Sequence, residues 1–367
     1  MTTSELFSPL TLRGVELSHR GWVSPMCQYS ADPATAPGVP NDWHLAHLGS
    51  FAVGGAALVM TEATAVNPVG MISPRDTGLY NDEQVDAWRR ITRFIHTHGA
   101  AGAKAGVQLA HAGRKASAYW PFSGQSGSVA ASDGGWQTVG PTTAAFGTLA
   151  PPQAMTASDI AGVVRDFADA ASRAVEAGFD TIEIHAAHGY LLHQFRSPLV
   201  NTRTDDWGGD EAGRARLTLD VIDAVRSRVP DDFPVLLRIS ASDWADGGVD
   251  IDDSVRLARK VKERGVDLID VSSGGAVADA RMRIGPGYQT GFAARIRAEA
   301  KIPVGAVGLI GSADQAEHII ATGQADGVLI ARAALRDPHW WQRAAHALDQ
   351  PVSWAPQYER AAPRGSF

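Results

Sequence analysis

The chain has 367 residues, 44% hydrophobic and 20% charged, which is ordinary for a globular protein with a sizeable core. Its formal net charge is −7, and acidic and basic residues are interspersed, which argues against nucleic acid and membrane surfaces as partners and favours small molecules. The start of the chain lacks a signal-peptide pattern, and no apolar run approaches the roughly 18 residues of a membrane span, so we expect a cytoplasmic protein.

Cysteine content narrows the possible chemistry further. Cys27 is the only cysteine, which excludes an internal disulfide, a cysteine-ligated iron-sulfur cluster and a cysteine-rich zinc site. A lone thiol is either an inert core residue or a reactive group, and its position must decide between them.

Alternating strand and helix patterns run through the chain. Residues 10–17 alternate around Arg13-Gly14 and predict a hairpin that plugs the floor of the fold. Short apolar runs then predict eight strands, at residues 22–23, 58–60, 105–109, 181–184, 235–239, 268–271, 304–307 and 328–330. Helices are expected between and after them, near 42–55, 81–98, 157–177, 211–229, 252–264, 290–300, 312–322 and 338–348. This order predicts an α/β fold, a (β/α)8 TIM barrel, with residues 1–367 forming a single domain.

Two segments exceed a minimal barrel. Residues 117–156 form a long excursion after the third strand, rich in Gly, Ser, Ala and Pro. The alternative is a disordered surface loop, but Tyr119, Trp120 and Trp136 make it too aromatic for a solvated linker, so we expect a lid over the catalytic face. Residues 351–367 form a tail that would ordinarily be a frayed terminus; its aromatic residues and Arg360 instead favour a subunit interface.

Polar residues gather where the active site of such a barrel is built, at the carboxyl ends of its strands. The fourth strand runs into His185, His188 and Tyr190, with Gly189 allowing a sharp turn. Taken alone, each histidine has about even odds of being a hydrogen-bonded structural residue. Gly308 and Arg332, after the last two strands, are typical of a phosphate site. Cys27 follows the first predicted strand and so lies at the same rim, where an inert core thiol is the weaker interpretation.

Several motifs, in order along the chain, resemble one family. They are Ser-Pro-Met-Cys-Gln-Tyr, Gln-Leu-Ala-His-Ala-Gly-Arg-Lys, His-Ala-Ala-His-Gly-Tyr, Asn-x-Arg-Thr-Asp-x-x-Gly-Gly and Arg-Ile-Ser-Ala-Ser-Asp. From about Phe7 to Arg360 the chain is similar to the Old Yellow Enzyme family of FMN-dependent NADPH ene-reductases. Cys27 and the paired histidines resemble its thermophilic-like, or xenobiotic reductase, branch.

The resemblance implies a bound FMN and a role for each matching residue. Arg238 would lie near the N1/O2 edge of the flavin, where a cation stabilises the reduced anionic ring. The expected cofactor-binding residues are Ser24, Pro25, Met26, Cys27, Ala63, Gln108, Arg238, Gly308, Ala331 and Arg332. Ala331 departs from the family, which usually has glycine before this arginine, and its methyl group would crowd the phosphate.

The resemblance also implies the substrate chemistry. His185 and His188 would donate hydrogen bonds to a substrate carbonyl oxygen, Tyr190 would deliver a proton to the α-carbon, and Tyr29 would hold the carbonyl substituent. The expected activity is reduction of the activated C=C bond of α,β-unsaturated carbonyl or nitro compounds. No Gly-x-Gly-x-x-Gly occurs, so the nicotinamide, preferably NADPH, must visit the same flavin face in a ping-pong mechanism. Arg360 would complete the substrate pocket of a neighbouring subunit in a homodimer or homotetramer.

Two other functions remain open from the residues. One is a metal-dependent TIM-barrel hydrolase that uses His185 and His188 with His111 or Asp243, although it leaves Arg238 and the phosphate end unexplained. The other is a flavin-binding protein without turnover, which the presence of Tyr190 argues against. The resemblance itself implies no metal.

Overall fold

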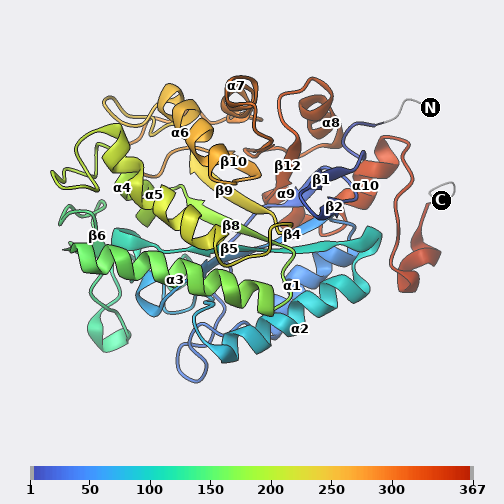
Figure 1. Ribbon diagram of the computed structural model, residues 1–367. Helices are drawn as coiled ribbons and strands as arrows, with labels where there is room; N and C mark the ends of the chain where they lie inside the picture. The colour runs from blue at the N-terminus through green and yellow to red at the C-terminus, as the bar shows by residue number, and fades with distance from the viewer. Residues whose placement is uncertain (1–3, 364–367) are drawn as a thin grey trace.

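A computed structural model describes residues 4–363. Eight parallel strands close into a barrel, and the helices surround it (Figure 1). The barrel strands, in spatial order, are β10 (Leu268–Ser272), β11 (Val304–Ala306), β12 (Gly327–Ile330), β3 (Gly21–Val23), β4 (Leu58–Ala65), β5 (Lys104–Ala110), β8 (Thr181–Ala186) and β9 (Val235–Ser240). The predicted (β/α)8 barrel is therefore confirmed.

The outer helices follow the expected alternation. They are α1 (Asp42–Val53), α2 (Asp82–His98), α3 (Ala157–Glu176), α5 (Glu211–Arg226), α6 (Ile251–Glu263), α7 (Thr290–Ala300), α8 (Ala313–Ala321) and α10 (Trp340–Ala347). Side-chain caps explain several starts: the Thr156 side chain accepts from the backbone N–H of Asp159, whose carboxylate reaches back to the Thr156 backbone. The helix predicted to reach residue 229 ends at Arg226 instead, because Pro230 cannot continue it.

Two short helices were not predicted. They are α4 (Leu191–Arg196) and α9 (Arg332–Arg336), and each begins almost directly after a barrel strand. Neither is long enough to show a helical hydrophobic period, so sequence pattern alone reads both as loop. None of the helices among residues 4–363 is both long and apolar enough to cross a membrane.

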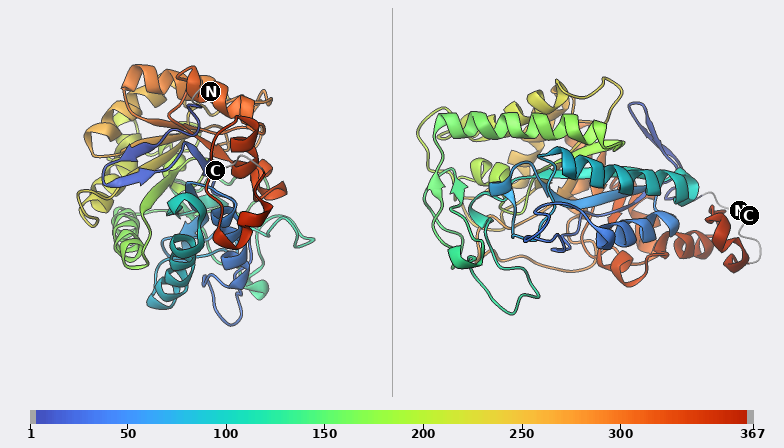
Figure 2. Two further views of the ribbon diagram at one scale, coloured as in Figure 1. Left: turned by 90° about the vertical axis from the view of Figure 1, so that its right-hand side faces the viewer. Right: turned by 90° about the horizontal axis from the view of Figure 1, so that it is seen from below.

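The two ends of the barrel are closed differently. The predicted hairpin is present as β1 (Leu10–Leu12) and β2 (Val15–Leu17), and it covers the amino end of the strands. Leu12 and Leu17 pack into a cluster with Trp22 and the first residues of neighbouring strands. The excursion of residues 117–156 lies at the opposite end and contains the short parallel pair β6 (Val139–Gly140) and β7 (Gln153–Ala154) (Figure 2). The site therefore lies between the excursion and the barrel.

Candidate active site

The loop after β8 brings together the three residues that the sequence singled out. His188 has a left-handed backbone with a φ of 58°, and Gly189 follows at 73°. A Cβ atom on Gly189 would collide with the backbone of Gly275 in the loop after β10, so only glycine permits this approach. The chain turns back as a result. The His185 ring centroid lies 5.2 Å from that of His188 and 5.0 Å from that of Tyr190.

Hydrogen bonds set the protonation of this pair. His185 Nδ1 accepts from the backbone N–H of Ala187 at 3.2 Å, which leaves the proton on Nε2 as a free donor. The His188 Nε2 atom lies 2.7 Å from Ser272 Oγ. Burial lowers the pKa of both rings well below the ordinary value, and the nearby Arg238 charge lowers it further. Both histidines are therefore neutral at physiological pH.

Tyr190 lies beside a half-buried cation. The Lys115 ammonium group lies 5.2 Å from the centroid of the Tyr190 ring and donates a 2.8 Å hydrogen bond to the carbonyl oxygen of His188. Burial raises the pKa of Tyr190 well above its ordinary value, so the phenol is protonated. Burial lowers the pKa of Lys115 to about 8. Lys115 thus holds the strained loop and faces the aromatic ring at the same time.

Cys27 and Tyr29 meet at the rim, on the loop that follows β3. Tyr29 has a left-handed backbone with a φ of 51°, and its side chain slightly offsets the effect of burial on the Cys27 pKa. Burial raises the pKa of the Cys27 thiol, and the nearby carboxylates of Asp76 and Glu62 raise it further. The thiol is therefore neutral, and it is a polar contact rather than a nucleophile.

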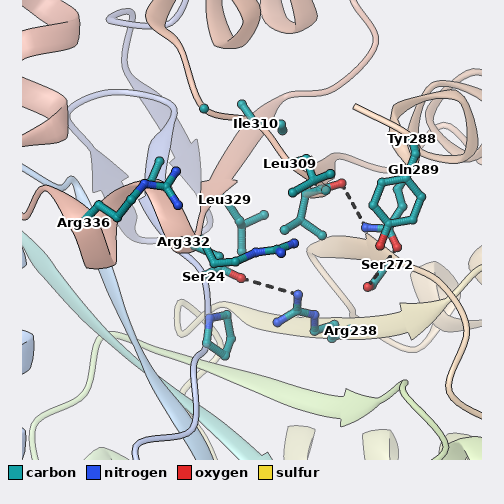
Figure 3. A pocket seen from close by; sticks show the side chains of 16 residues that line it. Ser24, Arg238, Ser272, Tyr288, Gln289, Leu309, Ile310, Leu329, Arg332 and Arg336 are labelled. Carbon is teal, nitrogen blue, oxygen red and sulfur yellow. Dashed lines mark hydrogen bonds between the residues drawn. The ribbon is translucent and has the colours of Figure 1, made fainter. Parts of the chain in front are cut away.

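A cavity of about 300 Å³ opens beside this cluster. Its lining includes six of the predicted cofactor residues, namely Ser24, Pro25, Arg238, Gly308, Ala331 and Arg332. Figure 3 shows Arg238 of β9 and Arg332 at the start of α9 reaching the same space, with Arg238 Nη2 hydrogen-bonded to Ser24 Oγ at 3.4 Å. Ser272 also lines the cavity, so the cavity and the histidine pair form one continuous site.

The donor set of this cavity fits a phosphate. Neither Arg332 nor Arg336 is ion-paired with any residue between 4 and 363, and no carboxylate lines the cavity. Gly308 has a φ of 123°, and a Cβ atom there would press on the side chains of Tyr288 and Gln289. Free guanidinium groups beside a glycine turn are what an anion requires. Ala331 also lines the cavity, and its φ of −105° is not a left-handed value that would require glycine.

The remaining predicted cofactor residues lie on the adjoining strands. Ala63 of β4 and Gln108 of β5 are direct partners in the sheet, just past a register shift between Met60 and Ala63. Met26 is partly buried against the core. Gln108 is nearly fully buried, and its Nε2 atom donates to the carboxyl group of Glu183 at 2.7 Å.

Arg360 does not reach this site within its own chain. It lies in a 3-10 turn, Pro356–Ala361, and is exposed. Figure 2 shows this tail at the end of the barrel that carries the hairpin, away from the excursion. Its expected contact with a neighbouring subunit therefore stays a prediction.

In the metal-dependent hydrolase alternative, Asp243 and His111 would bind a metal, but both side chains form hydrogen bonds with other residues. Asp243 pairs with His193 at 2.8 Å and accepts from Ser197 at 2.7 Å. His111 Nδ1 accepts from the backbone N–H of Gly113 at 3.0 Å. Among residues 4–363, no three histidine, cysteine or carboxylate side chains lie together as a metal site would require. The hydrolase alternative therefore has no support.

Sequence reasoning missed several residues of the site. Lys115 was part of a motif but received no role, and Ser272, which directly follows a predicted strand, received none either. Arg336 follows Arg332 by four residues, a spacing that places both on one face of a helix and could have revealed it. Tyr288 and Gln289 lie in a loop whose path the sequence does not specify.

Comparison with known proteins agrees with this geometry. Residues 5–350 match the NADH:flavin oxidoreductase / NADH oxidase family. The chain is 46% identical over 356 residues to an NADPH dehydrogenase of Geobacillus sp. (strain WCH70), covering 97% of this chain and 98% of the relative. It is 45% identical over 359 residues to an NADPH dehydrogenase of Listeria innocua serovar 6a, covering 98% of this chain and 99% of the relative.

Solved structures show the same architecture. Morphinone reductase in complex with tetrahydroNAD superposes with a TM-score of 0.76 at 25% identity, covering 94% of this chain and 91% of that chain. A 2-naphthoyl-CoA reductase complex superposes with a TM-score of 0.83 at 23% identity; the match covers 94% of this chain and 52% of that chain, and it shows the fold alone. The family match, the level of identity and the cavity with its free arginines together show that the chain belongs to the Old Yellow Enzyme family and is an FMN-dependent oxidoreductase.

Proposed function

We propose that the protein is an ene-reductase of the thermophilic-like branch, which reduces the activated C=C bond of α,β-unsaturated carbonyl or nitro compounds. The observation that carries this proposal is the meeting of two neutral histidines and a protonated tyrosine beside the cavity that holds free arginines. Such a group offers hydrogen-bond donors for a developing oxyanion and a proton donor within a few ångströms of them.

The cofactor would be held by residues that lie around the barrel mouth, at the carboxyl ends of several strands. Arg332 and Gly308, assisted by Arg336, would bind the phosphate, while Arg238 and Gln108 would contact the polar edge of the ring. Bound FMN would supply the hydride that the side chains of the chain cannot. The positive charge of Arg238 would favour the reduced form. Ser24, Pro25, Met26, Cys27 and Ala63 would line the remaining rim of the ring.

The histidine pair would hold the substrate oxygen. His185 carries its proton on Nε2, as its bond to Ala187 requires, and that proton is free to bind an oxyanion. When the Ser272 hydroxyl donates to His188 Nε2, the His188 proton resides on Nδ1 and becomes a second donor. Two donors in a site without bulk water stabilise negative charge more than the same donors in solvent.

Tyr190 would complete the reaction by giving its phenolic proton to the α-carbon. The neighbouring Lys115 ammonium group favours the phenolate that remains, which offsets part of the cost of burial. Tyr29 would hold the carbonyl substituent from the other side, and the neutral Cys27 thiol would tune the flavin potential through contact.

The reductant would be a nicotinamide nucleotide, with NADPH preferred because relatives at 45–46% identity are NADPH dehydrogenases. The described chain forms one barrel, and its sequence has no Gly-x-Gly-x-x-Gly for a separate nucleotide site, so donor and acceptor would occupy the same face in turn. Ping-pong kinetics follow from that shared space. We also propose a cytoplasmic homodimer or homotetramer in which Arg360 reaches a partner's substrate pocket.

Reoxidation of the reduced enzyme tests the proposal. NADPH should reduce the bound flavin, and 2-cyclohexenone or N-ethylmaleimide added without oxygen should restore the oxidised spectrum. If no enone or nitroalkene reoxidises the flavin faster than oxygen does, the ene-reductase assignment is wrong. The protein would then be a flavin reductase or a flavin-binding protein without this turnover.

A further inference from the structure

Two carboxyl groups and one guanidinium group are buried inside the barrel, directly beneath the mouth. Glu183 and Asp270 have no exposed surface, and Arg238 is 5% exposed. Glu183 precedes His185 by two residues on β8, so both side chains face the barrel interior, one layer apart. Sheet register places Glu183 opposite Gln108 of β5, and Asp270 of β10 opposite Arg238 of β9.

The contacts form a chain across the barrel. Gln108 Nε2 donates to Glu183 Oε1 at 2.7 Å, and Arg238 Nε lies 3.0 Å from Asp270 Oδ2. Glu183 Oε2 and both carboxyl oxygens of Asp270 have no hydrogen-bond partner among residues 4–363, so Arg238 and Asp270 meet as an ion pair only. Two ionised carboxylates would therefore leave buried acceptors unsatisfied, which is costly.

Charge counting gives the same answer. The charged group that faces this pair from β9 is Arg238, while Gln108 on β5 and His185 on β8 are neutral. Both carboxyl groups are fully buried, and one guanidinium group cannot neutralise two buried carboxylates. Burial raises the pKa of Glu183, and the adjacent Asp270 charge raises it further. Burial also raises the pKa of Asp270, but the interaction between the two carboxyl groups lowers it while raising that of Glu183, which is the direction expected if the proton resides on Glu183.

We propose that Glu183 and Asp270 hold one proton and one negative charge between them, and that protonated Glu183 is a positioning residue for Gln108. Asp270 then neutralises Arg238, and the Glu183 hydroxyl donates to Asp270. The carbonyl oxygen of Glu183 accepts the Gln108 amide N–H group, which turns the Gln108 amide oxygen toward the barrel mouth. An acceptor at that place suits the imide N–H of a flavin ring. This last step rests on the cofactor placement proposed above.

Vibrational spectroscopy tests the shared proton without relying on activity. In full-length protein near pH 7, with FMN and after its removal, the infrared difference spectrum of native minus Glu183→Gln should show the C=O band of a buried carboxylic acid. The Asp270→Asn variant should lose the same band, because Glu183 is then the sole carboxyl facing Arg238 and ionises. A native minus Glu183→Gln difference spectrum without an acid band would overturn the proposal; Asp76, also buried with a pKa raised to about 7, contributes equally to both proteins and cancels.

FMN affinity tests the positioning role. Glu183→Gln keeps an acceptor for Gln108 and a donor for Asp270, so its FMN Kd should stay within about threefold of the native value. Glu183→Leu removes the acceptor and should weaken FMN binding roughly tenfold, the effect of one unsatisfied buried amide. Equal affinities in the two variants would show that Glu183 does not orient Gln108.

These outcomes separate the inference from the proposed function. The acid band depends on the barrel interior alone and does not require an ene-reductase. An acid band together with unchanged FMN affinity in both variants would leave the proton in place and overturn the orientation of Gln108. If enones do not reoxidise the reduced flavin, but the acid band and the difference in FMN affinity are both observed, the proposed function is wrong and the role of Glu183 stands. If Asp270→Asn does not fold, the isosteric Glu183→Gln variant still decides the protonation.

Discussion

The floor and the mouth of the barrel are built on the same strands and follow opposite rules. At the floor, Leu12 and Leu17 of the hairpin pack on Trp22, and apolar burial stabilises the fold. At the mouth, His185 is buried and Tyr190 is half-buried, and both have few polar partners. Their pKa values shift toward the neutral forms because charge is costly there. The floor of the barrel therefore stabilises the fold, whereas the polar groups at the mouth lower its stability and provide the chemistry.

The largest expected effect is at the mouth. His185→Ala should reduce the rate of enone reduction by ~10²–10³, because one oxyanion donor is lost from a site that excludes water. Thermal stability should change little by comparison. Stopped-flow reoxidation of reduced enzyme by 2-cyclohexenone gives the rate. His318→Ala, on the exposed surface of α8, is the control and should retain native kinetics. Near-native rates in His185→Ala would remove His185 from the oxyanion site.

A matched change at the floor should act on stability alone. Leu17→Ala removes a side chain that is 1% exposed and should lower the free energy of unfolding by about 3 kcal/mol. Turnover of the folded protein should stay native, since neither Leu17 nor any other hairpin residue lines the cavity. Urea unfolding and steady-state kinetics separate the two quantities. Leu335→Ala, where the leucine is 46% exposed, should cost much less. A fall in turnover without loss of stability would mean that the two ends are not independent.

The fold could be predicted because the pattern that specifies it is local. All eight barrel strands were placed within a few residues, since buried parallel strands read as short apolar runs between capped helices. Strand β4 shows the limit: it was predicted to end at Met60 and extends to Ala65. The register shift after Met60 and the polar residues Thr61 and Glu62 hide the second half of this strand from a hydrophobicity pattern.

The site was harder to predict than the fold. His185, His188 and Tyr190 are close in sequence, so their meeting needs only one turn. The Glu183–Asp270 pair was not recognised, because its members are 87 residues apart by their numbers and each reads as a polar position in a strand. Sheet register brings them together, and a single sequence does not specify register. Lys115 escaped for a similar reason, since its contacts are backbone carbonyls in two other loops.

The dependence of the free energy of unfolding on pH should differ between changes at the mouth and changes at the floor. Unfolded histidines titrate near pH ~6.5, whereas burial, and then Arg238, lowers the pKa of His185 in the folded protein. Below pH ~6.5 the unfolded chain therefore binds more protons, and stability falls as pH falls toward the lowered value. His185→Gln should reduce the slope of unfolding free energy against pH between 6 and 5 by up to about 1.4 kcal/mol per unit. Leu17→Ala should keep the native slope, and equal slopes in all three proteins would contradict a neutral His185.

The smallest expected effect concerns Arg360, on the tail near the floor of its own barrel. If the tail completes the mouth of a neighbouring subunit, the two ends are connected only through assembly. Arg360→Ala should then raise the KM for enone roughly fivefold, the effect of about 1 kcal/mol for one exposed charge-assisted contact, with no loss of bound FMN. Arg93→Ala, an exposed arginine of α2, removes the same charge and should leave KM native. Sedimentation at assay concentration supplies the second measurement, because the contact exists only in an oligomer. A fully active monomer, or an unchanged KM in Arg360→Ala, would show that the substrate pocket is formed by one subunit and that Arg360 does not contribute to it.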